Sequence, residues 1–108
     1  MVKKRLHKGA VENLRPEEKD ELLARLRNEV DNLDEEIAGL LIKRFNASVE
    51  IGEIKRALGL AAYDALREKE IDENIDKLAE DPDIKKSLRR VYERIIDESR
   101  TVQKEGEK

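Results

Sequence analysis

Helical periodicity is clearest in the segment Leu26-Arg27-Asn28-Glu29-Val30-Asp31-Asn32-Leu33-Asp34, and it continues without a proline as far as Gly59. Apolar residues recur every three or four positions along this segment, as they do on one face of a helix. Near the middle the same face becomes polar, because the next positions on it include Arg44, Ser48 and Lys55. A buried charge needs a partner, so two cations on a buried face indicate either internal ion pairs or a site for an anion.

The ends of this helix are marked by its flanking residues. Pro16 suits the first position and Gly59 suits the cap that follows Leu58. A helix with these bounds would be about 65 Å long, whereas a compact chain of this size is only about 35 Å across. Much of the apolar face would then lie in water. We therefore predict a homodimer in which the long helices of two chains pack together.

Two glycines lie inside the helix, although each costs about 1 kcal/mol relative to alanine. Close helix packing is the simplest explanation for Gly39. The same explanation applies to Gly52, but its place between Arg44 and Lys55 also allows it to leave room for a ligand.

Two further helices are predicted, and each also carries polar residues on the face that should be buried. These residues are Asp64, Arg67 and Glu68 on the second helix, and Ser99 and Gln103 on the third. The third helix should begin at Pro82 with Asp81 as its N-cap, and residues 104–108 should fray. No segment alternates as a strand does, so we predict an all-α fold with three helices, one of them very long.

Composition narrows the class of protein. The 108 residues suffice for one domain, and 45% charged with 3% aromatic residues is typical of long helices with solvated outer faces. A net charge of −3 argues against nucleic-acid binding, and no apolar run reaches transmembrane length. With no cysteine and one histidine, His7, a thiolate or histidine metal site is not expected. We expect a cytoplasmic protein with a flexible basic extension over residues 1–15 and a helical domain over residues 16–108.

Helical geometry groups the cations of the long helix. Arg44 and Lys55 are eleven positions apart and so lie about 20° from each other around the axis. Arg27 lies about 100° from Arg44 and about 25 Å away along the axis, too far to share a pocket within one helix. In an antiparallel dimer it could reach the pocket of the partner. Pairing of the two cations with Asp64 and Glu68 remains the alternative, but polar breaks on three separate faces favour a polar pocket.

The order and spacing of these polar residues resemble the all-helical chorismate mutase family, the AroQ class, over residues 26–103. The segments that carry the resemblance are Leu26-Arg27-x-x-Val30-Asp31-x-Leu33-Asp34, Ile37, Leu40-Leu41, Arg44, Ile51-Gly52-x-Ile54-Lys55, Gly59, Asp64-x-x-Arg67-Glu68 and Ile95-Ile96-x-x-Ser99-Arg100-x-x-Gln103. The resemblance implies an intertwined homodimer with two active sites, each borrowing one arginine, and no cofactor. Ala65 departs from the pattern, since the family often has proline there.

The resemblance also implies a role for each polar residue in converting chorismate to prephenate. Arg44 and Arg27 of the partner subunit would bind the two carboxylates of the substrate, and Ser99 would contact one of them. Lys55 and Gln103 would donate hydrogen bonds to the ether oxygen.

The opposite end of the substrate carries a ring hydroxyl. By the same resemblance, Glu68 with the Asp64 segment would receive this hydroxyl. Arg67 would either orient Glu68 or add positive potential.

Two other functions remain open from the sequence. One is an isochorismate-pyruvate lyase on the same fold, and the other is a non-catalytic helical dimerisation or regulatory module. The continuous segment around Lys55 and the pair Ser99 and Gln103 favour the mutase. Feedback by phenylalanine or tyrosine, and docking to another shikimate-pathway enzyme, are also left open.

Overall fold

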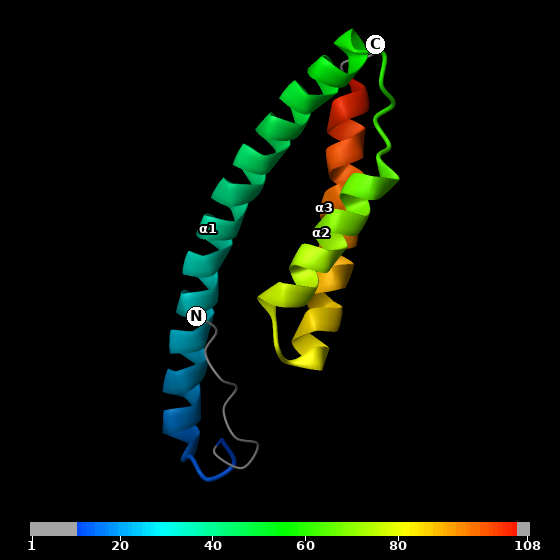
Figure 1. The fold of residues 1–108 in the computed structure, drawn as a ribbon. Coiled ribbons are helices and arrows are strands. Elements are labelled where there is room, and N and C mark those ends of the chain that lie inside the picture. Colours follow the sequence, from blue (N-terminus) through cyan, green and yellow to red (C-terminus); the bar gives the residue numbers. More distant parts are fainter. Residues whose placement is uncertain (1–10, 106–108) are drawn as a thin grey trace. The chain divides into compact units, whose positions relative to one another are not determined.

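The computed structural model describes residues 11–105, and these form three helices without a β-strand (Figure 1). The helices are α1 (Pro16–Ala57), α2 (Ala65–Leu78) and α3 (Pro82–Glu105). The prediction of an all-α fold with one very long helix is confirmed. The chain divides inside α1, after Leu40, into two compact units, which are described separately below. Among the described residues, none of the helices has the length and apolar character needed to cross a membrane.

The start of α1 is stabilised by its own first turn. Glu18 accepts hydrogen bonds from the backbone N–H of Arg15 (3.4 Å) and from its Nε (2.7 Å). The Arg15 carbonyl in turn accepts from the Lys19 N–H at 2.9 Å. Glu18 thus binds the backbone donor just before a helix that begins at Pro16, as predicted. Residues 1–10 of the predicted extension lie outside the described part of the chain.

The end of α1 is closed by a left-handed glycine. Gly59 has φ +71°, which is costly for residues with a Cβ, and it follows the last helical residue, Ala57, by two positions. The Leu60 N–H donates to the Lys55 carbonyl (2.7 Å) and the Gly59 N–H donates to the Arg56 carbonyl (3.1 Å). This pair of bonds is the Schellman motif. The predicted cap at Gly59 is confirmed.

Gly59→Ala is expected to lower the free energy of unfolding by about 1 kcal/mol, because alanine pays a steric penalty in the left-handed region. Gly59→Asn is the matched control and should lose less, since asparagine tolerates this conformation. Urea denaturation at a fixed protein concentration measures both. Equal losses in the two variants would contradict the role given to the backbone conformation.

The start of α2 differs from the prediction in one detail. Asp64 lies just before the helix as its N-cap, with extended backbone angles, and its Oδ1 accepts from the Arg67 N–H at 3.1 Å. The helix itself begins at Ala65. Asp64 therefore does not sit on the helix face with Glu68, and its carboxylate is used by the backbone.

The bounds of α3 follow from another N-cap. Asp81 Oδ1 accepts from the Asp83 N–H at 2.8 Å, and the helix begins at Pro82, as predicted. It continues to Glu105, so Lys104 is helical and the prediction that fraying starts there is wrong. Residues 106–108 lie outside the described residues.

Helices α2 and α3 run antiparallel (Figure 1). Charged side chains join them. Asp76 pairs with Arg89 and lies 3.5 Å from Lys85 Nζ, and Asp72 lies 3.5 Å from Arg89 Nε. Apolar packing between the helices is sparse. Ile75, 3% exposed, is the only buried hydrophobic side chain among residues 11–105. The ion pairs between α2 and α3 thus add to apolar contacts that are only partly buried in the single chain.

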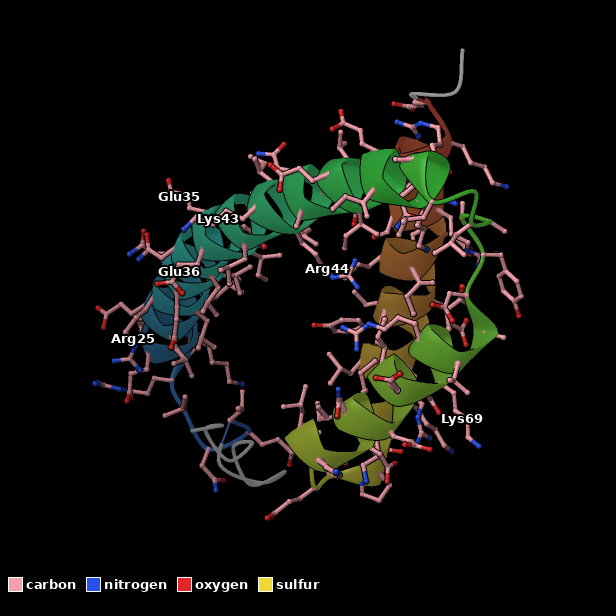
Figure 2. All side chains as sticks on the ribbon, turned by 45° about the horizontal axis from the view of Figure 1, so that its top comes forward. Arg25, Glu35, Glu36, Lys43, Arg44 and Lys69 are labelled. Atoms are coloured by element: carbon pink, nitrogen blue, oxygen red, sulfur yellow. The ribbon has the colours of Figure 1, made fainter. Side chains whose placement is uncertain are left out.

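The first part of α1, up to Leu40, displays its apolar face. Six side chains at helical spacing are 41–65% exposed: Leu23, Leu26, Val30, Leu33, Ile37 and Leu40. Glu35 and Glu36, on the same part of the helix, are exposed as well (Figure 2). Both the apolar and the charged side chains of this segment are therefore exposed to solvent in the single chain.

Candidate functional site

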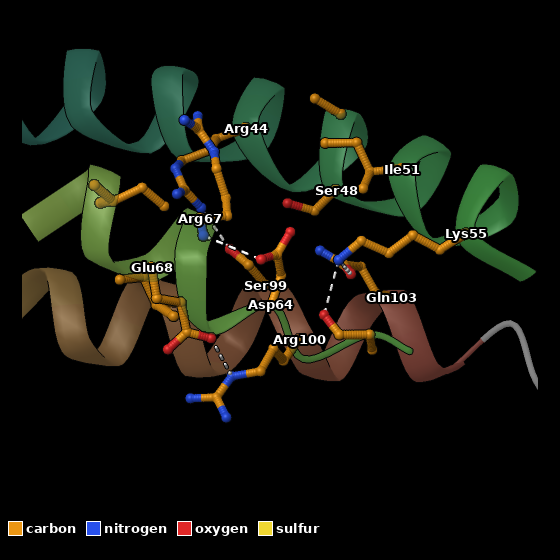
Figure 3. A pocket seen from close by; sticks show the side chains of 14 residues that line it. Arg44, Ser48, Ile51, Lys55, Asp64, Arg67, Glu68, Ser99, Arg100 and Gln103 are labelled. Atoms are coloured by element: carbon orange, nitrogen blue, oxygen red, sulfur yellow. Dashed lines mark hydrogen bonds and ion pairs between the residues drawn. The ribbon is translucent and has the colours of Figure 1, made fainter. Parts of the chain in front are cut away.

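A pocket of about 480 Å³ lies between the second part of α1, helix α2 with the loop before it, and α3 (Figure 3). Its volume is in the range of small-molecule sites. The predicted residues that line it are Arg44, Lys55, Asp64, Arg67, Glu68, Ser99 and Gln103. The remaining predicted residue, Arg27, is exposed on the first part of α1 and is not part of this lining.

Arg44 is oriented by a hydroxyl in the C-terminal half of α3. Its side chain points from α1 toward α3 (Figure 2), and its Nη1 donates to Ser99 Oγ at 2.5 Å. The same hydroxyl donates to the Ile95 carbonyl at 2.7 Å, one helical turn earlier. Ser99 is 7% exposed. A buried hydroxyl thus fixes the guanidinium while leaving its other N–H groups free for a ligand.

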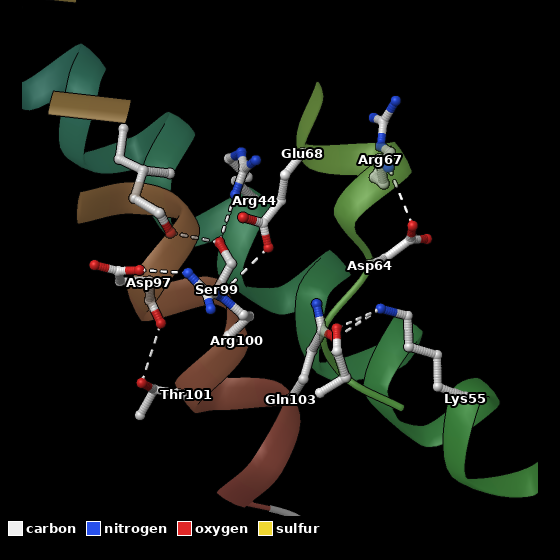
Figure 4. Close-up of polar contacts among 12 residues, drawn as sticks. Arg44, Lys55, Asp64, Arg67, Glu68, Asp97, Ser99, Arg100, Thr101 and Gln103 are labelled. Atoms are coloured by element: carbon white, nitrogen blue, oxygen red, sulfur yellow. Dashed lines mark hydrogen bonds and ion pairs between the residues drawn. The ribbon is translucent and has the colours of Figure 1, made fainter. Parts of the chain in front are cut away.

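Lys55 is held between a side chain and a backbone carbonyl (Figure 4). Its Nζ donates to the Ala62 carbonyl at 2.8 Å and to Gln103 Oε1 at 3.2 Å. An ammonium group has three donors, so one remains for a ligand. Because Lys55 can only donate, the oxygen of the Gln103 amide faces it, and the amide NH₂ is left to donate elsewhere.

Glu68 is paired with a cation that the sequence interpretation did not select. Arg100 Nε lies 3.4 Å from Glu68 Oε2, and Arg100 Nη2 donates to Asp97 at 2.6 Å. The guanidinium also lies 5.5 Å from the centre of the Tyr63 ring, within cation–π distance. These contacts hold Arg100 in place, and Arg100 in turn fixes the carboxylate of Glu68 at the pocket wall.

Arg67 lines the pocket, but its charge is directed elsewhere. Its Nη1 lies 3.3 Å from Glu70, and both side chains are exposed. Arg67 therefore does not orient Glu68. Arg100 contacts Glu68 instead.

Arg44 and Lys55, the two cations of α1 that line the pocket, have no carboxylate partner among residues 11–105. Arg44 contacts the Ser99 hydroxyl, and Lys55 contacts carbonyl oxygens, so both interact with neutral groups. The alternative in which they pair with Asp64 and Glu68 is not formed. Two positive charges thus face one small pocket, an arrangement suited to an anionic ligand.

Gly52 serves helix packing and leaves no room for a ligand. A Cβ atom built on it would lie 2.8 Å from the Cα and 2.9 Å from the carbonyl oxygen of Gln103. The space beside the glycine is thus filled by the backbone of α3.

The sequence interpretation did not select two contributors to the pocket. Arg100 follows Ser99 directly, so it is about 100° away on the helix and looks like a solvated charge. The Ala62 carbonyl belongs to the backbone, which carries no side-chain signal. A count of charges would have raised Arg100 as a candidate, because Glu68 needed a partner.

Comparison with known proteins identifies the family. The sequence model of a family described as chorismate mutase type II matches residues 26–104. The chain is also 29% identical over 86 residues to the chorismate mutase of Methanocaldococcus jannaschii, a match that covers 79% of this chain and 87% of that protein. The family match spans all eight predicted site residues, from Arg27 to Gln103.

Proposed function

The chain belongs to the chorismate mutase type II family and converts chorismate to prephenate, and we propose that this reaction takes place in the pocket between α1, α2 and α3. The protein is therefore an isomerase, and its family implies a place in phenylalanine and tyrosine biosynthesis. Loss of chorismate absorbance on addition of the purified protein, with prephenate identified as product, tests the activity. Release of pyruvate from isochorismate, with chorismate left unchanged, would instead indicate the isochorismate-pyruvate lyase.

The reaction sets simple demands on the site. In a [3,3] rearrangement the ether C–O bond breaks while a C–C bond forms within the same molecule, so no nucleophile is needed. The enzyme must hold the substrate in a compact conformer and stabilise negative charge that develops on the ether oxygen. It must also neutralise two substrate carboxylates.

The observation that carries the proposal is the pair of cations without carboxylate partners. Arg44 and Lys55 face the pocket from α1 and are hydrogen-bonded only to neutral oxygens among the described residues. A dianion of about the size of the pocket would compensate both charges. The remaining roles follow from where each group lies along the pocket.

Arg44 is the carboxylate-binding residue of this chain. A guanidinium forms paired hydrogen bonds with a carboxylate, and the contact with Ser99 fixes its direction. Ser99 is close enough to Arg44 to contact the same carboxylate.

Lys55 and Gln103 are the donors to the ether oxygen. Each has a donor left after their mutual contact, and both emerge from helices that meet at this end of the pocket. Because they are already held together, little reorganisation is needed as charge develops.

Glu68 is the acceptor for the ring hydroxyl, near the start of α2. Its pairing with Arg100 keeps the carboxylate at the pocket wall, and Asp64 at the helix N-cap lies beside it in the lining. Arg67 adds positive potential at this end without a direct part in the reaction.

We also propose that two chains form an intertwined homodimer with shared active sites. Six exposed apolar side chains along α1 need a partner of the same kind, and the apolar face of a second α1 provides one. Arg27 lies on this part of the helix and is exposed. In the dimer it would enter the partner's pocket and bind the second substrate carboxylate.

Gln103→Glu is expected to make the activity depend on pH. An amide donates at any pH, so the unaltered protein should have a flat kcat between about pH 5 and about pH 8. A carboxyl group donates only when protonated, and the neighbouring Lys55 ammonium favours its ionised form. The kcat of the variant should therefore be low at neutral pH and rise as the pH falls.

Gln103→Ala provides the control for this experiment, because it removes the donor without adding a titratable group. Its kcat should be low and independent of pH over the same range. A steep pH dependence in the unaltered protein, or a flat profile for Gln103→Glu, would argue against an amide donor to the ether oxygen.

A further inference from the structure

Gln103 occupies an unfavourable place for a residue that must be held still. Helix α3 ends at Glu105, so Gln103 is in the last turn. The last four carbonyls of a helix have no intrahelical donor, and helix ends fray for this reason. Gln103 is nevertheless only 8% exposed. Something outside α3 must order this turn.

Arg56 supplies the missing donor. Its Nη1 donates to the backbone carbonyl of Gln103 at 2.6 Å, and it comes from the last turn of α1. A cation at a helix C-terminus is favoured by the helix dipole, and hydrogen bonds from charged donors are the stronger kind. Arg56 itself is not among the residues that line the pocket.

Gly52 brings the two helices close enough for this contact. A Cβ atom at this position would lie 2.8 Å from the Cα of Gln103, so the backbones of α1 and α3 touch there. Gly52 and Arg56 are four positions apart and face the same residue. Gly52 allows the two helices to approach, and the hydrogen bond from Arg56 stabilises this close packing.

The backbone contact determines where the amide of Gln103 can lie. Its Oε1 meets Lys55 Nζ at 3.2 Å, near the limit of a hydrogen bond, so a small displacement of the turn would separate them. A displacement of about 1 Å can cost about a hundredfold in rate. We propose that Arg56 is a positioning residue that caps α3 and thereby keeps the Gln103 amide beside Lys55. The inference rests on the donor role proposed for Gln103.

A double-mutant cycle tests whether Arg56 acts through Gln103. Arg56→Met keeps an unbranched side chain but removes the donor, and it is made both in the unaltered protein and together with Gln103→Ala. In the unaltered background kcat should fall about tenfold, with a change in KM of less than about twofold. In the Gln103→Ala background the same substitution should change kcat by less than about twofold.

Two further variants separate positioning from a general effect on folding. Arg90→Met, at an exposed position of α3, should leave kcat unchanged. Arg56→Lys keeps a charged donor and should recover most of the lost activity. Circular dichroism and the melting temperature establish that each variant is folded at the assay temperature.

Each remaining outcome overturns a defined statement. An equal fall of kcat in both backgrounds, or a lower melting temperature with unchanged kcat, would show that Arg56 does not act through the amide. If Gln103→Ala alone left kcat unchanged, the donor role of Gln103 would be wrong, and the positioning role would fall with it.

Discussion

Lys55→Ala should lower kcat for chorismate about a thousandfold, the loss expected when a donor to a developing negative charge is removed. The ammonium group is held at 2.8 Å from the Ala62 carbonyl and 3.2 Å from Gln103 Oε1, so its position is set before substrate arrives. The effect should be larger on kcat than on KM, because charge on the ether oxygen appears mainly in the transition state.

Lys43→Ala is the matched control, since Lys43 is an exposed lysine on the same helix. It should retain full activity. The measurement is the initial rate of chorismate loss over a range of substrate concentrations, with the fold of each variant verified by circular dichroism. A kcat within about tenfold of the unaltered protein in Lys55→Ala would remove Lys55 from its proposed role.

Two inactive variants should restore activity to each other when their chains are mixed. Arg27→Ala and Arg44→Ala are each expected to lose at least about a hundredfold in kcat/KM, because each removes a charged partner of a substrate carboxylate. In a mixed dimer one of the two sites receives both unaltered arginines. Random pairing makes about half of the dimers mixed, so about a quarter of all sites should be active.

The experiment consists of unfolding the two variants together, refolding them and measuring activity against each variant treated alone. Arg25→Ala mixed with Arg44→Ala is the control, with Arg25 exposed on the same part of α1 as Arg27. Here the Arg25→Ala chains are expected to be active by themselves, so mixing should add nothing beyond their own share. Failure of the first mixture to exceed its separate components would contradict sites shared between chains.

The bounds of the helices could be predicted closely because residues with specific capping preferences lie at their ends. Pro16, Gly59 and the pair Asp81-Pro82 each satisfy a backbone requirement that few other residues meet. Asp64 was misplaced because an aspartate three positions before Arg67 fits either a helix face or an N-cap. Periodicity alone does not separate these two cases.

The polar residues of the pocket could be predicted, but the ion pairs and hydrogen bonds among them could not. Which carboxylate meets which cation depends on the packing of three helices, and the pairing of Glu68 with Arg100 crosses from α2 to α3. The contact of Lys55 with Ala62 depends on the path of a loop. Backbone carbonyls at such places leave no mark in the side-chain pattern.

The scarcity of buried apolar side chains affects how the protein folds and assembles. Ile75 is the only buried hydrophobic side chain among residues 11–105, and the apolar face of α1 up to Leu40 is exposed, so a single chain has little hydrophobic core of its own. In the proposed homodimer, folding and association would then be a single event rather than successive ones. Chains would become active only after they had associated, so the concentration of the protein would set the threshold for catalysis.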